Sequence, residues 1–155
     1  MDFGHSGVIE GYQSRELILM LHWQMEVTRE PRNKGWYRGR FGLRAEPTVI
    51  INFEPRFGHA GGLGLLLRYT FQAHEHFQPW FQVGAGFLGL DLDIADQADG
   101  FAFMPQLGFG LNYRINRHHS VDLGFRYHHI SNAFTQDPNG GIDTCQLLLG
   151  YGYHF

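Results

Sequence analysis

Long runs in which large apolar residues alternate with small or polar ones are the feature that most constrains this chain. Over residues 121–131, one set is Val121, Leu123, Phe125, Tyr127, His129 and Ser131, and the other is Asp122, Gly124, Arg126, His128 and Ile130. Successive residues of a β-strand point to opposite faces of a sheet, so a period of two predicts strands. Helical periodicity is almost absent. The chain is therefore predicted to be all-β.

Turn-forming residues divide the alternating runs and set the expected strand boundaries. We expect strands at about 3–11, 15–25, 36–51, 60–71, 79–90, 102–114, 120–131 and 142–155. The clearest turns are expected at 31–35, 95–100, 116–120 and 137–141. Because no linker or shift in composition divides the 155 residues, we expect a single domain over 1–155.

The character of the two faces predicts which of them lies outside. A barrel of eight strands has an interior just wide enough for side chains, which suits glycine and hydrogen-bonded polar residues. The large aromatic face suits a lipid-facing band, and strands of roughly 10 to 14 residues match a tilted membrane crossing. The glycine-rich face also carries arginines, namely Arg38, Arg40, Arg68, Arg114 and Arg126. We therefore predict an eight-stranded antiparallel transmembrane β-barrel, with a soluble lipocalin-like barrel as the alternative.

Charge and cysteine content exclude several other classes. The net charge of −3, from 12 basic and 15 acidic residues, gives no reason to expect a nucleic-acid partner. The single Cys145 excludes an internal disulfide and a thiolate metal cage, and we expect a small strand residue there. No apolar run reaches the roughly 18–20 residues of a membrane helix. The start lacks the basic and apolar segments of a signal peptide. For a secreted or outer-membrane protein we therefore expect a mature form with an added or retained Met1, whereas for a cytoplasmic protein this lack indicates nothing.

A group of polar residues interrupts the large apolar face near the end of the sequence. His129 and Ser131 are two residues apart and so share a strand face, and Asp143 follows across a Gly/Pro/Asn turn. A hairpin brings a nucleophile, a base and an orienting acid within reach, which is the logic of a serine hydrolase. Polar residues on a lipid-facing wall are costly and usually functional. We therefore expect a hydrolase site on the outer wall, acting on an acyl ester in the bilayer.

The same residues resemble the C-terminal signature of the lipid A 3-O-deacylases of the bacterial outer membrane, the PagL-like family. That signature is His-x-Ser-Asn-Ala, followed by Pro-Asn-x-Gly-Ile and an acid. Here it reads His129-Ile130-Ser131-Asn132-Ala133 and Pro138-Asn139-Gly140-Gly141-Ile142-Asp143. The resemblance is strong over residues 79–155 and extends to the first half only as a strand rhythm.

The resemblance implies an outer-membrane serine esterase that removes the 3-position acyl chain of lipid A and releases a 3-hydroxy fatty acid. It implies Ser131 as the nucleophile, His129 as the general base and Asp143 as the orienting acid. Asn139 and Asn132 are implied to help build the oxyanion site with loop amides. No cofactor or metal is required, lipid A of lipopolysaccharide is the expected partner, and nothing in the sequence sets the oligomeric state. The acid is often Glu in this family, and Asp is shorter by one C–C bond, about 1.5 Å, so either the hairpin brings Asp143 closer or the triad is weaker.

Plainer interpretations stand beside these expectations. His128 and His129 are alternatively interfacial aromatic residues, and Asn132 alternatively only ends a strand. We expect solvated turns, not metal sites, at 74–76 and 118–119, and ion pairs between the inner arginines and three acids, Glu46, Glu54 and Asp122. A non-enzymatic structural or adhesion barrel predicts no esterase activity, and a soluble lipid-binding barrel predicts monodisperse protein without detergent.

Overall fold

The computed structural model describes residues 2–7, 15–28, 35, 37–54, 57–72, 74–92 and 97–155. Its strands are β1 (Asp2–Gly7), β2 (Arg15–Met20), β3 (Trp23–Glu26), β4 (Gly39–Glu54), β5 (Gly58–Phe71), β6 (Phe77–Asp91), β7 (Gly100–Arg114), β8 (His119–Ile130) and β9 (Ile142–Tyr153). From β4 onward the expected boundaries hold to within about three residues. Residues 8–11 of the first expected strand lie outside the described residues, as do residues 31–34 and 95–96 of two expected turns. In the described part of the chain, no helix is long and apolar enough to cross a membrane.

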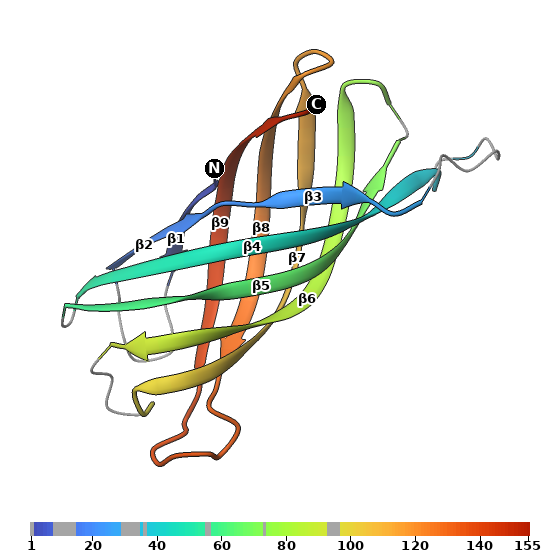
Figure 1. The fold of residues 1–155 in the computed structure, drawn as a ribbon. Coiled ribbons are helices and arrows are strands. Elements are labelled where there is room, and N and C mark those ends of the chain that lie inside the picture. The colour runs from blue at the N-terminus through green and yellow to red at the C-terminus, as the bar shows by residue number, and fades with distance from the viewer. Residues whose placement is uncertain are drawn as a thin grey trace.

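Antiparallel pairing between neighbours closes these strands into a barrel (Figure 1). From β4 to β9, each strand pairs with the next one along the chain. β1 pairs with both β9 and β2, and β2 pairs with β4, which completes the ring. β2 and β3 keep the same register against β4 and together form the second crossing, so the nine strands make eight crossings. The predicted eight-stranded antiparallel barrel is confirmed.

The expected strand over 15–25 is interrupted, and Pro47 on β4 explains why. β2 ends opposite Thr48, and β3 begins opposite Ala45. Between them, the backbone N–H of Leu21 donates to the carbonyl oxygen of Pro47 at 3.1 Å. Proline has no N–H to return the bond. The crossing therefore stays in register but loses one ladder hydrogen bond near its middle.

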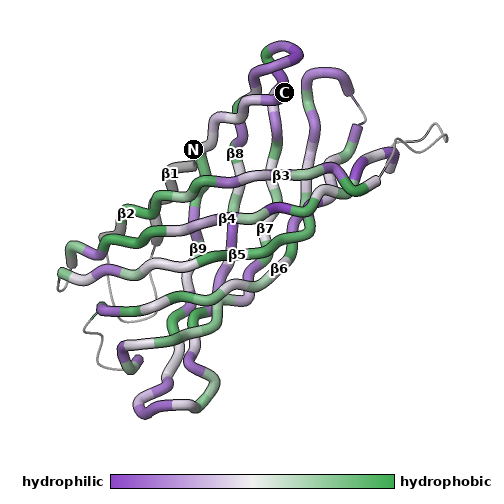
Figure 2. The backbone as a smooth tube through the Cα atoms, viewed as in Figure 1, coloured by the Kyte–Doolittle hydropathy of each residue, from purple (hydrophilic) through white to green (hydrophobic). Residues whose placement is uncertain are grey.

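The two sets of alternating residues occupy the two faces of the wall. Large apolar side chains such as Leu107, Phe125 and Leu149 point outward and are exposed. Glu46 and Arg126 point into the lumen and are buried. Figure 2 shows hydrophobic and hydrophilic positions recurring along the strands. The outer wall is thus apolar, as the sequence predicts for a face in contact with lipid.

The lumen contains two of the ion pairs expected from the sequence. Arg126 donates through both terminal nitrogens to the Glu46 carboxylate, with the Nη2–Oε2 distance at 3.0 Å. Arg68 pairs with Asp122, which also accepts from Asn112 Nδ2 at 2.6 Å. The side chain of the third expected acid, at position 54, lies outside the described residues. These pairs link strands on different sides of the barrel through its interior.

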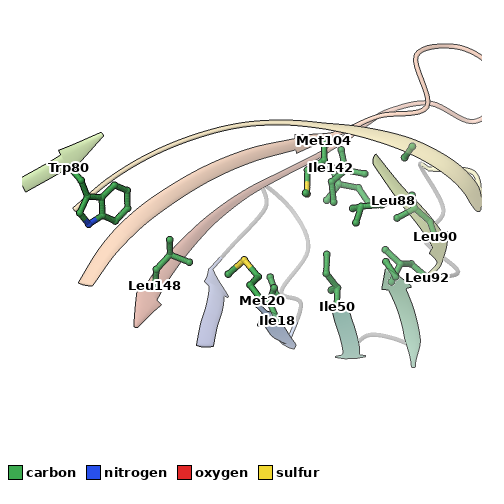
Figure 3. Close-up of a cluster of buried hydrophobic side chains, with 13 residues drawn as sticks. Ile18, Met20, Ile50, Trp80, Leu88, Leu90, Leu92, Met104, Ile142 and Leu148 are labelled. Carbon is green, nitrogen blue, oxygen red and sulfur yellow. The ribbon is translucent and has the colours of Figure 1, made fainter. Parts of the chain in front are cut away.

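Apolar side chains fill the lumen at the end where β8 stops and β9 begins. Figure 3 shows Leu88, Leu90, Met104 and Ile142 gathered there, while Trp80 lies apart at the far side of the cluster. Trp80 instead packs under the guanidinium of Arg68, whose carbon is 4.2 Å from the ring centroid. Ile130 of β8 and Ile142 of β9 belong to this cluster, so the base of the β8–β9 hairpin packs into the apolar part of the lumen.

Candidate active site

The loop over residues 131–141 joins β8 to β9 and projects from the end of the barrel opposite both chain termini (Figure 1). His129 is the next-to-last residue of β8, and Asp143 is the second residue of β9. Ser131 follows β8 directly and is held by backbone hydrogen bonds with Phe103 of β7, at 2.8 and 3.0 Å. The site is therefore built on the ends of three neighbouring strands.

The pairing of His129 and Asp143 is the central contact of the site. The register of β8 against β9 places the two residues directly opposite each other. His129 Nδ1 lies 2.8 Å from Asp143 Oδ1. Their side chains are 38% and 57% exposed, so they lie on the outer wall and not in the lumen. The shorter acid thus reaches the imidazole fully, because the hairpin brings the two strands together at this point.

Tyr127 supplies a second donor to the same carboxylate oxygen. Its hydroxyl donates a hydrogen bond to Asp143 Oδ1. The sequence reasoning placed Tyr127 on the outward face but gave it no role in the site. The available signal was its spacing of two residues from His129, which puts both side chains on one face of the strand.

Ser131 is in the same cluster, but its hydroxyl is turned toward the loop. Ser131 Oγ donates to Asn139 Oδ1 at 3.0 Å, and the backbone N–H of Ala133 donates to Ser131 Oγ at 3.2 Å. Among the described residues, no hydrogen bond joins this hydroxyl to His129. The structure thus brings four of the predicted residues to one place and orients the serine hydroxyl toward Asn139.

The fifth predicted residue, Asn132, is buried and holds the loop together. Its Nδ2 donates to the carbonyl oxygens of Gln136, at 2.9 Å, and of Pro138, at 3.4 Å. Its backbone N–H donates to Asn139 Oδ1 at 3.0 Å. The side chain of Asn132 is therefore committed to loop carbonyls.

Left-handed backbone shapes both ends of this loop. Ala133 has φ 53° and Phe134 has φ 62°, a conformation that is costly for residues with a Cβ. Gly141 has φ 77°, and a Cβ there would lie 2.7 Å from His129 Cε1. Glycine at 141 thus allows the loop to pass directly over the imidazole, which is a requirement that the sequence reasoning missed.

A separate cavity of about 650 Å³ lies in the lumen. Charged and polar side chains from the chain-terminal end of the barrel line it, among them Arg40, Arg114 and His154. None of the residues of the His129 cluster is part of this lining. Among the described residues, no group of His, Cys, Asp and Glu side chains is arranged to hold a metal ion.

Fold and site together define a small β-barrel with an apolar outer wall that carries a serine and a hydrogen-bonded histidine–aspartate pair. The family described as "Lipid A 3-O-deacylase (PagL)" matches the sequence over residues 10–152. The chain belongs to this family and is an outer-membrane lipid A 3-O-deacylase. Membership of this enzyme family decides against the two alternatives considered from the sequence, a non-enzymatic barrel and a soluble lipid-binding barrel.

A solved structure supports the fold independently. The chain is similar to the one titled "Crystal structure of the outer membrane enzyme PagL", with a TM-score of 0.75 and 21% sequence identity. The match covers 96% of this chain and 95% of that chain. No curated protein matches the sequence.

Proposed function

We propose that Ser131, His129 and Asp143 act as a catalytic triad that hydrolyses the ester-linked 3-position acyl chain of lipid A and releases a 3-hydroxy fatty acid. The observation that carries the proposal is the 2.8 Å contact between His129 Nδ1 and Asp143, with Ser131 two residues further along the same face. A carboxylate on Nδ1 leaves Nε2 of the imidazole available as a base. Family membership supplies the substrate and the ester bond.

The topology supports access to lipid A in the outer leaflet. In barrels with an even number of strands both termini lie on the periplasmic side. The hairpin loop lies at the opposite end from the termini (Figure 1), so β8 runs outward and ends at the cell surface. We therefore expect the site to lie at the depth of the ester groups of the outer leaflet.

The first chemical step requires the serine hydroxyl to leave Asn139 Oδ1, to which it now donates. We expect a turn about the Cα–Cβ bond of Ser131 to free the hydroxyl for His129 Nε2. Catalytic hydrogen bonds are often long or misaligned before substrate binds and tighten in the complex. Ser131 Oγ then attacks the ester carbonyl while His129 takes its proton, and Asp143 stabilises the imidazolium that forms. His129 next protonates the departing sugar oxygen, and water activated by the same imidazole releases the fatty acid from the serine.

Stabilisation of the tetrahedral oxyanion is assigned to the loop, with Asn139 and Asn132 as its main residues. Asn139 faces Ser131 Oγ through Oδ1, so donation from its side chain requires the amide to turn and present Nδ2. The backbone N–H of Ala133 already points at Ser131 Oγ from 3.2 Å. Asn132 contributes by holding these groups in place through its bonds to two loop carbonyls. Loss of one oxyanion donor typically costs about 2.7–4 kcal/mol.

The decisive experiment compares wild-type protein with Ser131→Ala on purified lipid A in mixed micelles. Mass spectrometry of the wild-type products should show lipid A lacking one 3-hydroxyacyl chain, together with the free fatty acid. Ser131→Ala should form neither product. Ser120→Ala is the matched control, because it removes a buried hydroxyl from the other end of β8 and should keep wild-type activity. Full activity in Ser131→Ala contradicts the proposal.

A further inference from the structure

We propose that Tyr127 is a positioning residue of this enzyme, whose hydroxyl fixes the Asp143 carboxylate in the orientation that His129 requires. The inference rests on the proposed triad and extends it by one residue. Three groups then act in series on the outer wall: the tyrosine hydroxyl holds the carboxylate, the carboxylate orients the imidazole, and the imidazole activates Ser131.

The strand register brings Tyr127 to this contact. On β9, Asp143 lies opposite His129, and Cys145 lies opposite Tyr127. Asp143 is therefore the diagonal neighbour of Tyr127 on the same face, a separation that an aromatic side chain can span. Both Tyr127 Oη and His129 Nδ1 bond to the same oxygen, Oδ1 of Asp143.

The direction of the new hydrogen bond follows from the groups themselves. An ionised carboxylate only accepts hydrogen bonds, so the hydroxyl of Tyr127 is the donor. Hydrogen bonds to a charged acceptor are roughly twice as strong as those between neutral groups. The contact also satisfies a hydroxyl that would otherwise face acyl chains without a partner.

A second donor matters because Asp143 is exposed on the wall. The terminal torsion of an aspartate side chain is broad, so a second hydrogen bond narrows the range of orientations open to the carboxylate. Tyr127 has a rigid ring anchored in β8, and its hydroxyl defines a fixed second point for Oδ1. The pair of donors thus restricts Asp143 to the rotamer that faces His129.

The lipid-facing wall by itself does not explain this contact. Large outward residues such as Phe109 and Phe125 cover the same wall with no hydroxyl at all. Tyr113, outward on β7 with 42% exposure against 40% for Tyr127, packs against Phe77 at the other end of the barrel. A role in the wall requires only the ring, whereas the proposed role requires the oxygen atom. Tyr127→Phe separates the two.

The test measures kcat and KM of Tyr127→Phe on lipid A in mixed micelles, after gel mobility with and without heating has shown that the barrel is folded. We expect kcat to fall about tenfold, the loss typical of one hydrogen bond to a charged group, with KM unchanged within about twofold. Tyr113→Phe, the matched control, should equal the wild type in both constants. An unchanged kcat overturns the inference, and so does an effect confined to KM, which would assign Tyr127 to substrate binding.

A double-mutant cycle shows whether Tyr127 acts through Asp143. In the Asp143→Ala background, adding Tyr127→Phe should cause no further loss, because the group that the hydroxyl holds is gone. The same factor lost in both backgrounds overturns the inference. Ser131→Ala keeps the two proposals apart. If it retains activity, the triad itself fails; if it is inactive while Tyr127→Phe matches the wild type, only the role of Tyr127 fails.

Discussion

The contact between Asp143 and His129 bears on the acid that the family resemblance leads one to expect as Glu. Asp is shorter than Glu by one C–C bond, about 1.5 Å. The 2.8 Å distance between His129 Nδ1 and Asp143 Oδ1 is an ordinary hydrogen-bond length, so the shorter side chain reaches the imidazole across the hairpin. A direct cross-strand pair has its side chains close enough for this, since opposite Cβ atoms lie about 4.5–5.5 Å apart.

Gly141 provides the prediction at the scale of a single residue. Gly141→Ala places a Cβ 2.7 Å from His129 Cε1 and 3.2 Å from Nε2, at a φ of 77° that alanine rarely adopts. We expect the imidazole to be displaced and kcat on lipid A to fall about tenfold or more, because small misplacements of catalytic groups are costly. Gly61→Ala is the control, since a Cβ there meets only one backbone oxygen, at 3.9 Å. Wild-type kcat in Gly141→Ala would show that the loop does not constrain His129.

Sequence reasoning at this scale succeeds where strand geometry decides and fails where loop geometry decides. The shared face of His129 and Ser131 follows from their spacing, and the approach of Asp143 follows from the hairpin. The direction of the Ser131 hydroxyl does not follow, because it depends on where the loop places Asn139. Tyr127 was within reach of the same spacing argument, but in the sequence an aromatic residue on the lipid-facing face is already explained by its ring, so nothing drew attention to the hydroxyl.

At the scale of elements, the β8–β9 hairpin combines two regular strands with an irregular loop that is fixed by side-chain bonds. Thr135 contributes through its N–H and its hydroxyl, which donate to the carbonyl oxygen of Asn132 at 3.1 and 2.7 Å. Asn132 itself is fully buried between the loop and the barrel. We therefore expect the order of this loop to depend mainly on Asn132, which takes part in five of its hydrogen bonds.

Asn132→Ala tests this dependence. The change removes the side-chain donor to the carbonyl oxygens of Gln136 and Pro138, and the Pro138 oxygen then keeps only its bond from the N–H of Ala98. We expect kcat to fall and the loop to become sensitive to limited proteolysis, while the thermal unfolding of the barrel stays close to wild type. Lost activity without increased cleavage would instead assign Asn132 a direct part in the oxyanion site. Unchanged activity would contradict both roles.

The interrupted second crossing shows a limit of pattern reading at the level of elements. The alternation over 15–25 is regular, so it predicts one continuous strand. The break originates in Pro47 of the partner strand, because proline has no N–H to donate to the carbonyl oxygen of Leu21. A strand's own sequence does not reveal which residue its neighbour places opposite it.

At the scale of the whole molecule, the barrel has an apolar exterior and a polar interior that contains ion pairs, the reverse of a soluble protein. The alternation predicts this arrangement because long strands with large residues on one face fit lipid better than water. The ion pair of Arg126 with Glu46 is almost completely buried, with side chains 1% and 0% exposed. Each charge there depends on the other for its stability.

Glu46→Gln is the corresponding prediction. It leaves the Arg126 charge buried without its counter-charge, and removing one partner of such a pair typically costs about 3–5 kcal/mol. Urea unfolding of the protein folded into lipid vesicles measures the loss. The double variant Glu46→Leu, Arg126→Met should lose less free energy of unfolding than Glu46→Gln, because two apolar residues leave no buried charge. If Glu46→Gln unfolds like the wild type, the pair does not stabilise the barrel.

The central claim is that the serine on the lipid-facing wall becomes covalently acylated, and a phosphonate analogue of an acyl ester tests it most directly. The analogue should form a stable adduct with wild-type protein in micelles, and peptide mass mapping should place the added mass on Ser131. His129→Ala should label far more slowly, since the hydroxyl then lacks its base. An adduct on another residue, or labelling of Ser131→Ala at the wild-type rate, would contradict the mechanism.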